Sequence, residues 1–229
     1  MNITDFSGLE KKIGYSFTDK ALIKQALTHS SYMHEKMINK SGDYERLEFL
    51  GDAVLEVVSS EFLFHKYPDL PEGKLTKLRA SMVCESSLAM CARDIELGKY
   101  ILLGKGEEAC GGRERDSIIS DVMEAIIGAI FLDSGMEMAK NHIHKFILSD
   151  LEDKSLFSDS KSLLQEMLQG ENKKDFEYVL VAEDGPEHNK TFIVDVLVEG
   201  QVLGTGKGRT KKAAQQKAAY EAILKLKSR

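Results

Sequence analysis

ERLEFLGDA, residues 45–53, is the stretch that decides the fold of this 229-residue chain, and DVMEA, residues 121–125, repeats its pattern. Apolar residues recur in both at three- and four-residue spacing, which predicts two helices. At about 100° per residue, one helical face carries Glu45, Glu48 and Asp52, and one face of the second helix carries Asp121 and Glu124. The opposite faces are apolar, with Leu47, Leu50, Val54, Val57 and Val58 on the first helix and Val122, Met123, Ile126, Ile127 and Ile130 on the second.

Carboxylates that share a helix face repel one another, so packing alone does not explain them. A solvated acidic face is the common interpretation of such a pattern. Here two helices carry tight acidic clusters without intervening lysines, and Gly51 and Gly128 beside them permit close helix approach. Carboxylates that converge between two helices require a hard divalent cation, and oxygen ligands suit magnesium or manganese.

The two stretches resemble the signatures of the ribonuclease III family. Further motifs of that family match in the same order along the chain, so the resemblance covers essentially all of it. They are THSSY at 28–32, PEGKLT at 71–76, LRA at 78–80 and LGKGE at 103–107, followed by DVMEA at 121–125.

The resemblance implies an endonuclease that cuts double-stranded RNA by magnesium-dependent phosphodiester hydrolysis, with manganese as a substitute. The ends are 5′-phosphate and 3′-hydroxyl, and the expected substrates are structured precursors of ribosomal, messenger or transfer RNA. The matching positions make Asp52 and Glu124 catalytic and place the metal on four carboxylates, with two more in support. These are Glu48, Asp52, Asp121 and Glu124 for the metal, and Glu45 and Glu72 in support.

Phe49 projects beside the carboxylates and away from the apolar stripe of its helix. Either the next helix covers it or another subunit does, and exposed aromatics next to polar sites tend to mark interfaces. Members of the family that the chain resembles are homodimers in which this phenylalanine inserts into the partner. We therefore expect a homodimer with Phe49 as a dimer contact.

The composition, 42% hydrophobic and 30% charged, is that of a globular protein without a membrane partner. The sequence has no run of 18 apolar residues and no secretory pattern at its start, so we expect a cytoplasmic protein. Cys84, Cys91 and Cys110 show no metal spacing, and the first two are expected on one helix face as buried, reduced thiols.

The net charge of −6 argues against a nucleic-acid partner, but its distribution does not. Residues 1–157 carry 19 basic and 26 acidic side chains, and residues 158–204 carry 4 and 10. Residues 205–229 carry 8 basic side chains against 1 acidic one. A basic end on an acidic protein indicates a polyanionic partner.

The chain divides into two predicted domains. Residues 1–150 read as an all-α endonuclease and dimerisation domain, and residues 151–159, polar and without periodicity, read as a linker. Helices are expected over 18–29, 43–66, 72–98, 117–135 and 136–151, with a glycine-rich loop over 104–115.

Residues 160–229 read as helix, three antiparallel strands, helix, a small α+β (α-β-β-β-α) domain. The expected strands are 176–181, 191–198 and 201–207, between helices over 161–169 and 211–226. The order and the motifs resemble a double-stranded RNA-binding domain, in which both helices and one loop contact the duplex. The matching RNA contacts are Gln165, Glu166, His188, Lys211, Lys212 and Gln215.

Two glycine-rich stretches are candidate phosphate sites. Residues 204–208 lack the Walker spacing and the third glycine of the dinucleotide pattern, so no nucleotide cofactor is expected. Residues 104–115 form either a flexible connector or a phosphate cradle, in which Arg113 and Arg115 contact the RNA backbone. A rival interpretation is a non-catalytic double-stranded RNA-binding protein, but that would have lost acidic positions, and all are present.

Overall fold

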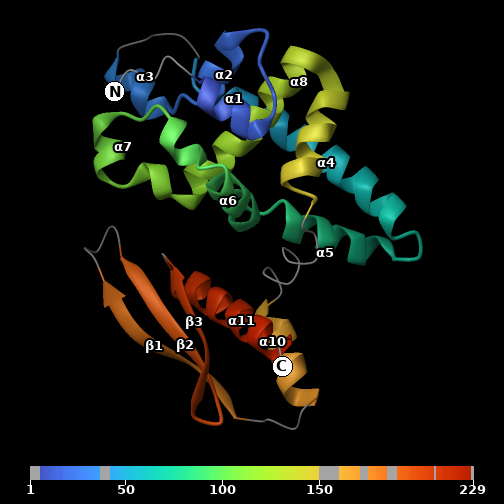
Figure 1. Ribbon diagram of the computed structural model, residues 1–229, viewed down its shortest axis with the longest axis vertical. Helices are drawn as coiled ribbons and strands as arrows, with labels where there is room; N and C mark the ends of the chain where they lie inside the picture. The colour runs from blue at the N-terminus through green and yellow to red at the C-terminus, as the bar shows by residue number, and fades with distance from the viewer. Residues whose placement is uncertain are drawn as a thin grey trace. The chain divides into compact units, whose positions relative to one another are not determined.

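The computed structural model describes residues 6–36, 42–149, 160–170, 175–184, 190–208 and 210–227. Two compact units form, Met1–Leu151 and Glu152–Arg229 (Figure 1). The predicted linker and the predicted RNA contact His188 lie outside the described residues. None of the helices within these ranges combines the length and apolar character that crossing a bilayer requires.

The first unit is helical, as predicted. Its described residues contain no strand, only an isolated bridge between Thr28 and Leu102. Two long helices, α4 and α8, make the most extensive packing contact and bury most of the apolar stripes that the sequence predicts on them. The elements are α1 Ser7–Ile13, α2 Lys20–Ala26, α3 Ser30–Glu35, α4 Glu45–Lys66, α5 Glu72–Met82, α6 Glu85–Asp94, η1 Leu97–Tyr100, α7 Lys105–Ala109, η2 Gly112–Glu114 and α8 Asp116–Phe146.

The ends of α4 and the bend in α8 follow the sequence signals. Helix α4 stops at Lys66, two residues before Pro68, because the residue preceding a proline disfavours helical geometry. Helix α8 changes direction at Gly135, whose φ of 81° is non-helical and suits glycine. The predicted boundary at Gly135 is therefore confirmed, because two helices meet there at a kink within α8.

The single helix expected over 72–98 is wrong. Helix α5 ends at Met82, and α6 begins at Glu85 after Cys84 adopts extended backbone with ψ of 156°. The Ser87 hydroxyl donates to the Ser81 carbonyl at 2.8 Å, so side chains satisfy the backbone at the break. Cys84, half-buried at the break, and Cys91, buried within α6, therefore do not share one helix face, and neither forms a disulfide.

Other boundaries shift in a similar way. Asp19, rather than Thr18, caps α2 by accepting from the Ala21 N–H at 2.8 Å. That helix ends at Ala26, and His29 caps α3 instead of ending α2. The loop expected over 104–115 contains α7 and η2. On α4, Val57 is 59% exposed rather than part of the buried stripe.

The second unit has the predicted α-β-β-β-α order. Its elements are α10 Ser160–Gly170, β1 Phe176–Asp184, β2 Thr191–Val198, β3 Gln201–Gly208 and α11 Lys211–Lys227. The antiparallel sheet has the order β1-β2-β3 (Figure 1), and Val196 of β2 pairs with Gly204 of β3. Helix α11 packs so closely on β3 that a Cβ at Gly204 would lie 2.3 Å from the Ala218 carbonyl oxygen. The small residues of this stretch therefore build the helix–sheet core.

Candidate active site

The predicted acidic site rests on backbone contact between α4 and α8. A Cβ on Gly51 would lie 1.8 Å from the carbonyl oxygen of Glu124, and one on Gly128 would lie 2.2 Å from that of Leu47. No larger side chain fits at either position without separating the helices. The close approach expected from the sequence is thus present, and it brings the acidic faces of both helices together.

The five predicted carboxylates of these two helices differ in burial. Glu45 and Asp52 are exposed on α4, whereas Glu48 of α4 and Asp121 and Glu124 of α8 are partly buried. The exposed groups can reach solvent or a ligand, and the partly buried groups are held by the surrounding helices. A carboxylate in this intermediate position has lost part of its hydration, which makes its charged form less favourable.

Burial raises the pKa values of the three partly buried carboxylates, and neighbouring carboxylates add to the shift of Glu48 and Glu124. Loss of hydration, followed by the charges of Asp121, Glu45 and Asp52, raises the pKa of Glu48 to about 7. Loss of hydration and then Asp52, Glu48 and Asp121 raise the pKa of Glu124 to about 8. Burial also raises the pKa of Asp121. The five groups therefore form one electrostatically coupled set that favours a proton or a cation.

Two neighbours that sequence reasoning did not assign to the site lie against Asp121. The Tyr44 hydroxyl, buried at the start of α4, lies 3.4 Å from the Asp121 carboxylate as its donor, and burial raises the tyrosine pKa. The ring of His29 lies 5.7 Å from the ring of Tyr44, and burial lowers the histidine pKa despite the charges of Glu107 and Glu45. Tyr44 therefore contacts the cluster directly, and His29 packs behind it through the contact between the two rings.

The donor set fits a hydrated hard cation. Within the described ranges, no three Asp, Glu, His or Cys side chains stand close enough to form a metal cage by themselves. Magnesium does not need such a cage, because it keeps several waters and takes only a few carboxylates. The raised pKa values of Glu48 and Glu124 add a physical reason, since a divalent cation removes the repulsion that burial enforces.

Glu72 does not join this cluster in the single chain. It is exposed in the first turn of α5 and accepts from the Thr76 hydroxyl at 3.2 Å. The charges that act on Glu48 and Glu124 do not include it. They do include a residue that the sequence analysis missed: Glu56, one helical turn beyond Asp52, contributes to the raised pKa of Glu124.

The two arginines of the 104–115 segment have different roles. Arg113 donates through Nη1 to the carbonyl oxygens of Gly98 and Ile101 at 2.9 and 2.7 Å, and through Nε to Glu108 at 2.6 Å. These bonds attach the 104–115 segment to η1 and occupy the guanidinium of Arg113. They therefore favour a connector over a phosphate cradle at this position. Arg115 is exposed and pairs with Glu107 at 2.8 Å.

Five of the six predicted RNA contacts of the second unit lie on two packed helices, α10 and α11. Gln165 and Glu166 are exposed on α10, and Lys211 and Lys212 are exposed in the first turn of α11. Two of these residues, Gln215 and Lys211, also bond to side chains of the second unit itself. Gln215 accepts from Lys161 at 2.7 Å, and Lys211 pairs with Glu183 of β1 at 3.1 Å.

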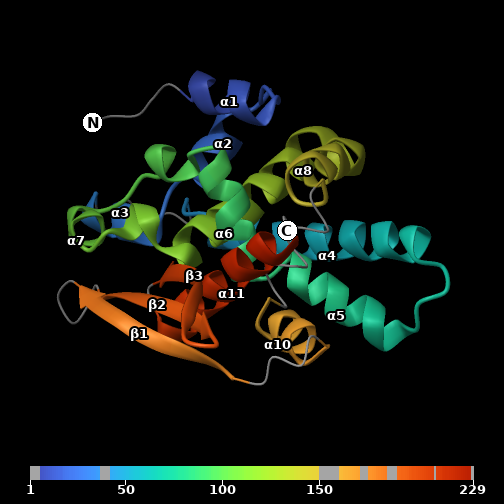
Figure 2. The ribbon, with the colours of Figure 1, turned by 60° about the horizontal axis from the view of Figure 1, so that its bottom comes forward.

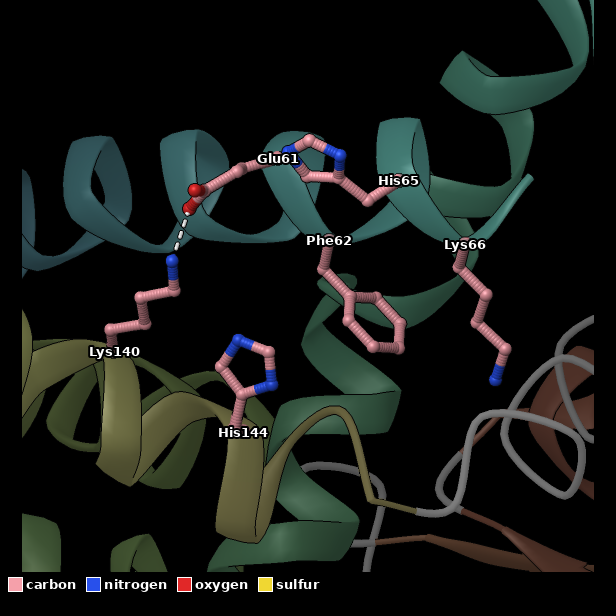
Figure 3. Close-up of a pocket in the computed structure, with 6 residues that line it drawn as sticks. All are labelled: Glu61, Phe62, His65, Lys66, Lys140 and His144. Carbon is pink, nitrogen blue, oxygen red and sulfur yellow. Dashed lines mark hydrogen bonds and ion pairs between the residues drawn. The ribbon is translucent and has the colours of Figure 1, made fainter. Parts of the chain in front are cut away.

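A pocket of about 330 Å³ lies at the other end of α4 and contains none of the predicted site residues (Figure 3). Glu61 and Lys140 pair there at 2.7 Å, while the Phe62 and His144 rings meet edge to face. Neighbouring His142 is fully covered by the helices, and burial lowers its pKa to about 4. Both histidines therefore pack against aromatic rings, His144 against Phe62 and His142 against Phe146.

Comparisons with known proteins match both units to known domain families. Residues 19–151 match the family model described as Ribonuclease-III-like, and residues 160–226 match the double-stranded RNA binding motif. Ribonuclease 3 of Caldanaerobacter subterraneus subsp. tengcongensis is 49% identical over 221 residues, which cover 95% of this chain and 96% of that one. Ribonuclease 3 of Bacillus cereus is 47% identical over 225 residues, 97% of this chain and 91% of that one.

A solved structure gives the same result for the first unit. The nuclease domain of ribonuclease III from Campylobacter jejuni is 47% identical, with a TM-score of 0.59 over 65% of this chain and 97% of that one. A second structure of that domain, also with a TM-score of 0.59, concerns flexibility in a region involved in its dimer formation. With close relatives matched along nearly its whole length, the chain belongs to the ribonuclease III family.

Proposed function

We propose that this protein is an endoribonuclease that hydrolyses phosphodiester bonds of double-stranded RNA with the aid of a divalent cation, leaving 5′-phosphate and 3′-hydroxyl ends. The observation that carries the proposal is the coupled acidic set between α4 and α8, in which Glu124 has a pKa of about 8. Carboxylates on a fully solvated helix face do not have pKa values raised this far. Membership of the ribonuclease III family supports the same reaction.

Glu48, Asp52, Asp121 and Glu124 would hold magnesium, or manganese in its place, directly or through water. A bound cation of this kind lowers the pKa of a water and neutralises charge on the phosphate. The carboxylates of Glu48 and Glu124, which favour protonation when alone, would remain ionised beside it. Asp52 and Glu124 are the residues that we assign to catalysis, and exposed Glu45 lies at the rim of the same face.

The second unit would supply most of the affinity for the duplex. Lys211 and Lys212 stand in the first turn of α11, where the helix dipole also favours phosphate. We assign residues 1–150 to catalysis and dimerisation, 151–159 to the linker and 160–229 to RNA binding. Structured precursor RNAs in the cytoplasm would be the substrates.

A homodimer would place two such acidic sites along one duplex, one for each strand. Phe49, next to Glu48, leaves 79% of its surface exposed in the single chain, which is costly for a phenylalanine in water. We propose that the partner subunit covers this ring. Val57 and Phe64, exposed at 59% and 67% further along α4, would extend the same apolar contact.

The test is a gel assay of a long RNA duplex with parent protein and with Glu124→Gln, in magnesium and in chelator. We expect the parent to cut only with magnesium, and the variant to bind the duplex without cutting it, since it keeps the shape of the side chain. Glu61→Gln, another change of charge on α4 but far from Glu124, should cut at the parental rate. Cleavage by Glu124→Gln at that rate, or none by the parent, would favour a different site or a non-catalytic RNA-binding protein.

A further inference from the structure

The Arg79 side chain forms an ion pair with the acidic face of α4. Arg79 belongs to α5, which runs back beside α4 (Figure 2). Arg79 of α5 donates through Nε to the Glu56 carboxylate at 2.7 Å and through Nη1 to the Ser60 hydroxyl at 2.8 Å. That hydroxyl in turn donates to the Glu56 carbonyl at 2.6 Å. The guanidinium thus holds one full turn of α4, and these bonds fix the direction of the Glu56 side chain.

Glu56 extends the acidic face by one turn, because it follows Asp52 by four residues. Its charge reaches Glu124 on the facing helix. The charges that act on Glu48 and Glu124 all come from other carboxylates. Glu56 forms an ion pair with an arginine. Glu48, Asp52 and Glu124, in contrast, are expected to bind a metal ion.

We propose that Arg79 is a positioning residue for the nuclease reaction: by binding Glu56 and Ser60, it neutralises the end of the acidic face so that RNA phosphates can pass beside Glu124. The inference rests on the proposed function. A metal ion compensates the carboxylates that hold it, but Glu56 lies one turn beyond Asp52 and needs its own counter-charge. Arginine suits this role because its planar guanidinium makes two directed bonds at once and stays charged.

This role has a signature that a purely structural role lacks. When Arg79 is replaced by glutamine, Glu56 keeps an unpaired negative charge near the site. That charge repels the RNA backbone but attracts a divalent cation, so the two affinities should move in opposite directions. A loosened α4–α5 contact would weaken both. Removing Glu56 as well should restore RNA affinity.

The experiment compares the parent with Arg79→Gln, Glu56→Gln and the double variant. The matched control is Lys140→Gln with Glu61→Gln, which removes an ion pair of the same 2.7 Å length from the far end of α4 (Figure 3). Three quantities are measured for each: Kd for a short RNA duplex in chelator, Mn²⁺ affinity by calorimetry, and KM and kcat in magnesium.

For Arg79→Gln we expect Kd and KM to rise by roughly fivefold, kcat to stay within about twofold, and Mn²⁺ to bind at least as tightly as to the parent. The double variant should return to within about twofold of the parental Kd and KM, as should the control. Glu56→Gln alone should bind the duplex at least as tightly as the parent, and this arm decides the matter if Arg79→Gln fails to fold.

Weak RNA binding by the double variant would overturn the inference, because Arg79 would then contact RNA itself or only hold α5. Weaker RNA binding by Glu56→Gln would overturn it too. If the parent does not cut RNA at all, the proposed function fails, whereas the Kd and Mn²⁺ measurements still test the pair.

Discussion

Replacing Glu124 by glutamine should stabilise the metal-free protein at alkaline pH. The pKa of Glu124 lies at about 8 in the folded chain against an ordinary value of 4.5, chiefly because of burial. A carboxyl group with a raised folded pKa contributes its full stability below pH 4.5, and the folded state loses that stability as the pH rises through 8. Glutamine keeps the shape but does not ionise, so the variant escapes this loss.

The size of the stability change follows from the shift in the pKa of Glu124. At about 1.4 kcal/mol per pH unit, the change from 4.5 to about 8 corresponds to nearly 5 kcal/mol. The side chain is only partly buried, and solvent screens a partly exposed charge, so we take about half, roughly 2 kcal/mol. For the first unit this amounts to a melting temperature higher by about 5 °C in the variant at pH 8.5.

Thermal unfolding in chelator at pH 5 and pH 8.5 measures the effect. We expect the variant to exceed the parent by about 5 °C at pH 8.5 and to differ little from it at pH 5. Added magnesium should raise the parent's melting temperature at pH 8.5 more than the variant's. If the two proteins show the same pH dependence in chelator, Glu124 is not a strained carboxylate. If magnesium stabilises them equally, Glu124 is no ligand.

Three further changes test the fold, the assembly and the RNA face. Phe49→Ala should weaken a dimer by about 2 kcal/mol or more at this contact while sparing the monomer, whose Phe49 is 79% exposed; a dimer still intact in sedimentation at low micromolar concentration would contradict this. Gly128→Ala would place a Cβ 2.2 Å from the Leu47 carbonyl oxygen, so it should cost about 1–3 kcal/mol in a denaturant melt and slow cleavage by separating α4 from α8. Glu183→Gln frees Lys211 from its 3.1 Å ion pair and should tighten duplex binding by up to about fivefold in a filter-binding titration, whereas weaker binding would mean that Glu183 positions the lysine for RNA.

The packing of α4 against α8 could be predicted because it depends on local, periodic features. Helical spacing places Glu48 and Asp52 on one face, and the structure keeps that face polar. The two glycines, Gly51 and Gly128, indicate a close helix contact, and each meets the backbone of the other helix. The assignment of the acidic residues to a metal stays a prediction, because the geometry provides coupled carboxylates but no closed cage in the described residues.

The features that could not be predicted from the sequence depend on contacts between residues that are distant in the chain. Nothing in the spacing of Glu56 or Arg79 indicates that the two meet, because their pairing requires α5 to turn back along α4. The break between α5 and α6 was not predicted, for a different reason. Cys84 is compatible with a helix, and the break is stabilised by a bond between the two helices, from the Ser87 hydroxyl to the Ser81 carbonyl oxygen.

Negative charge is useful in this protein only where it is compensated. The first 157 residues carry seven more acidic than basic side chains, so an uncompensated acidic face would repel the duplex that it is proposed to cut. Three forms of compensation are available in the described residues: protonation of Glu48 and Glu124 when no cation is bound, a divalent cation when one is, and Arg79 for Glu56. The first two exchange with each other, whereas the arginine is permanent. RNA affinity in the absence of metal should therefore fall as the pH rises through 7 and 8, and magnesium should abolish that dependence.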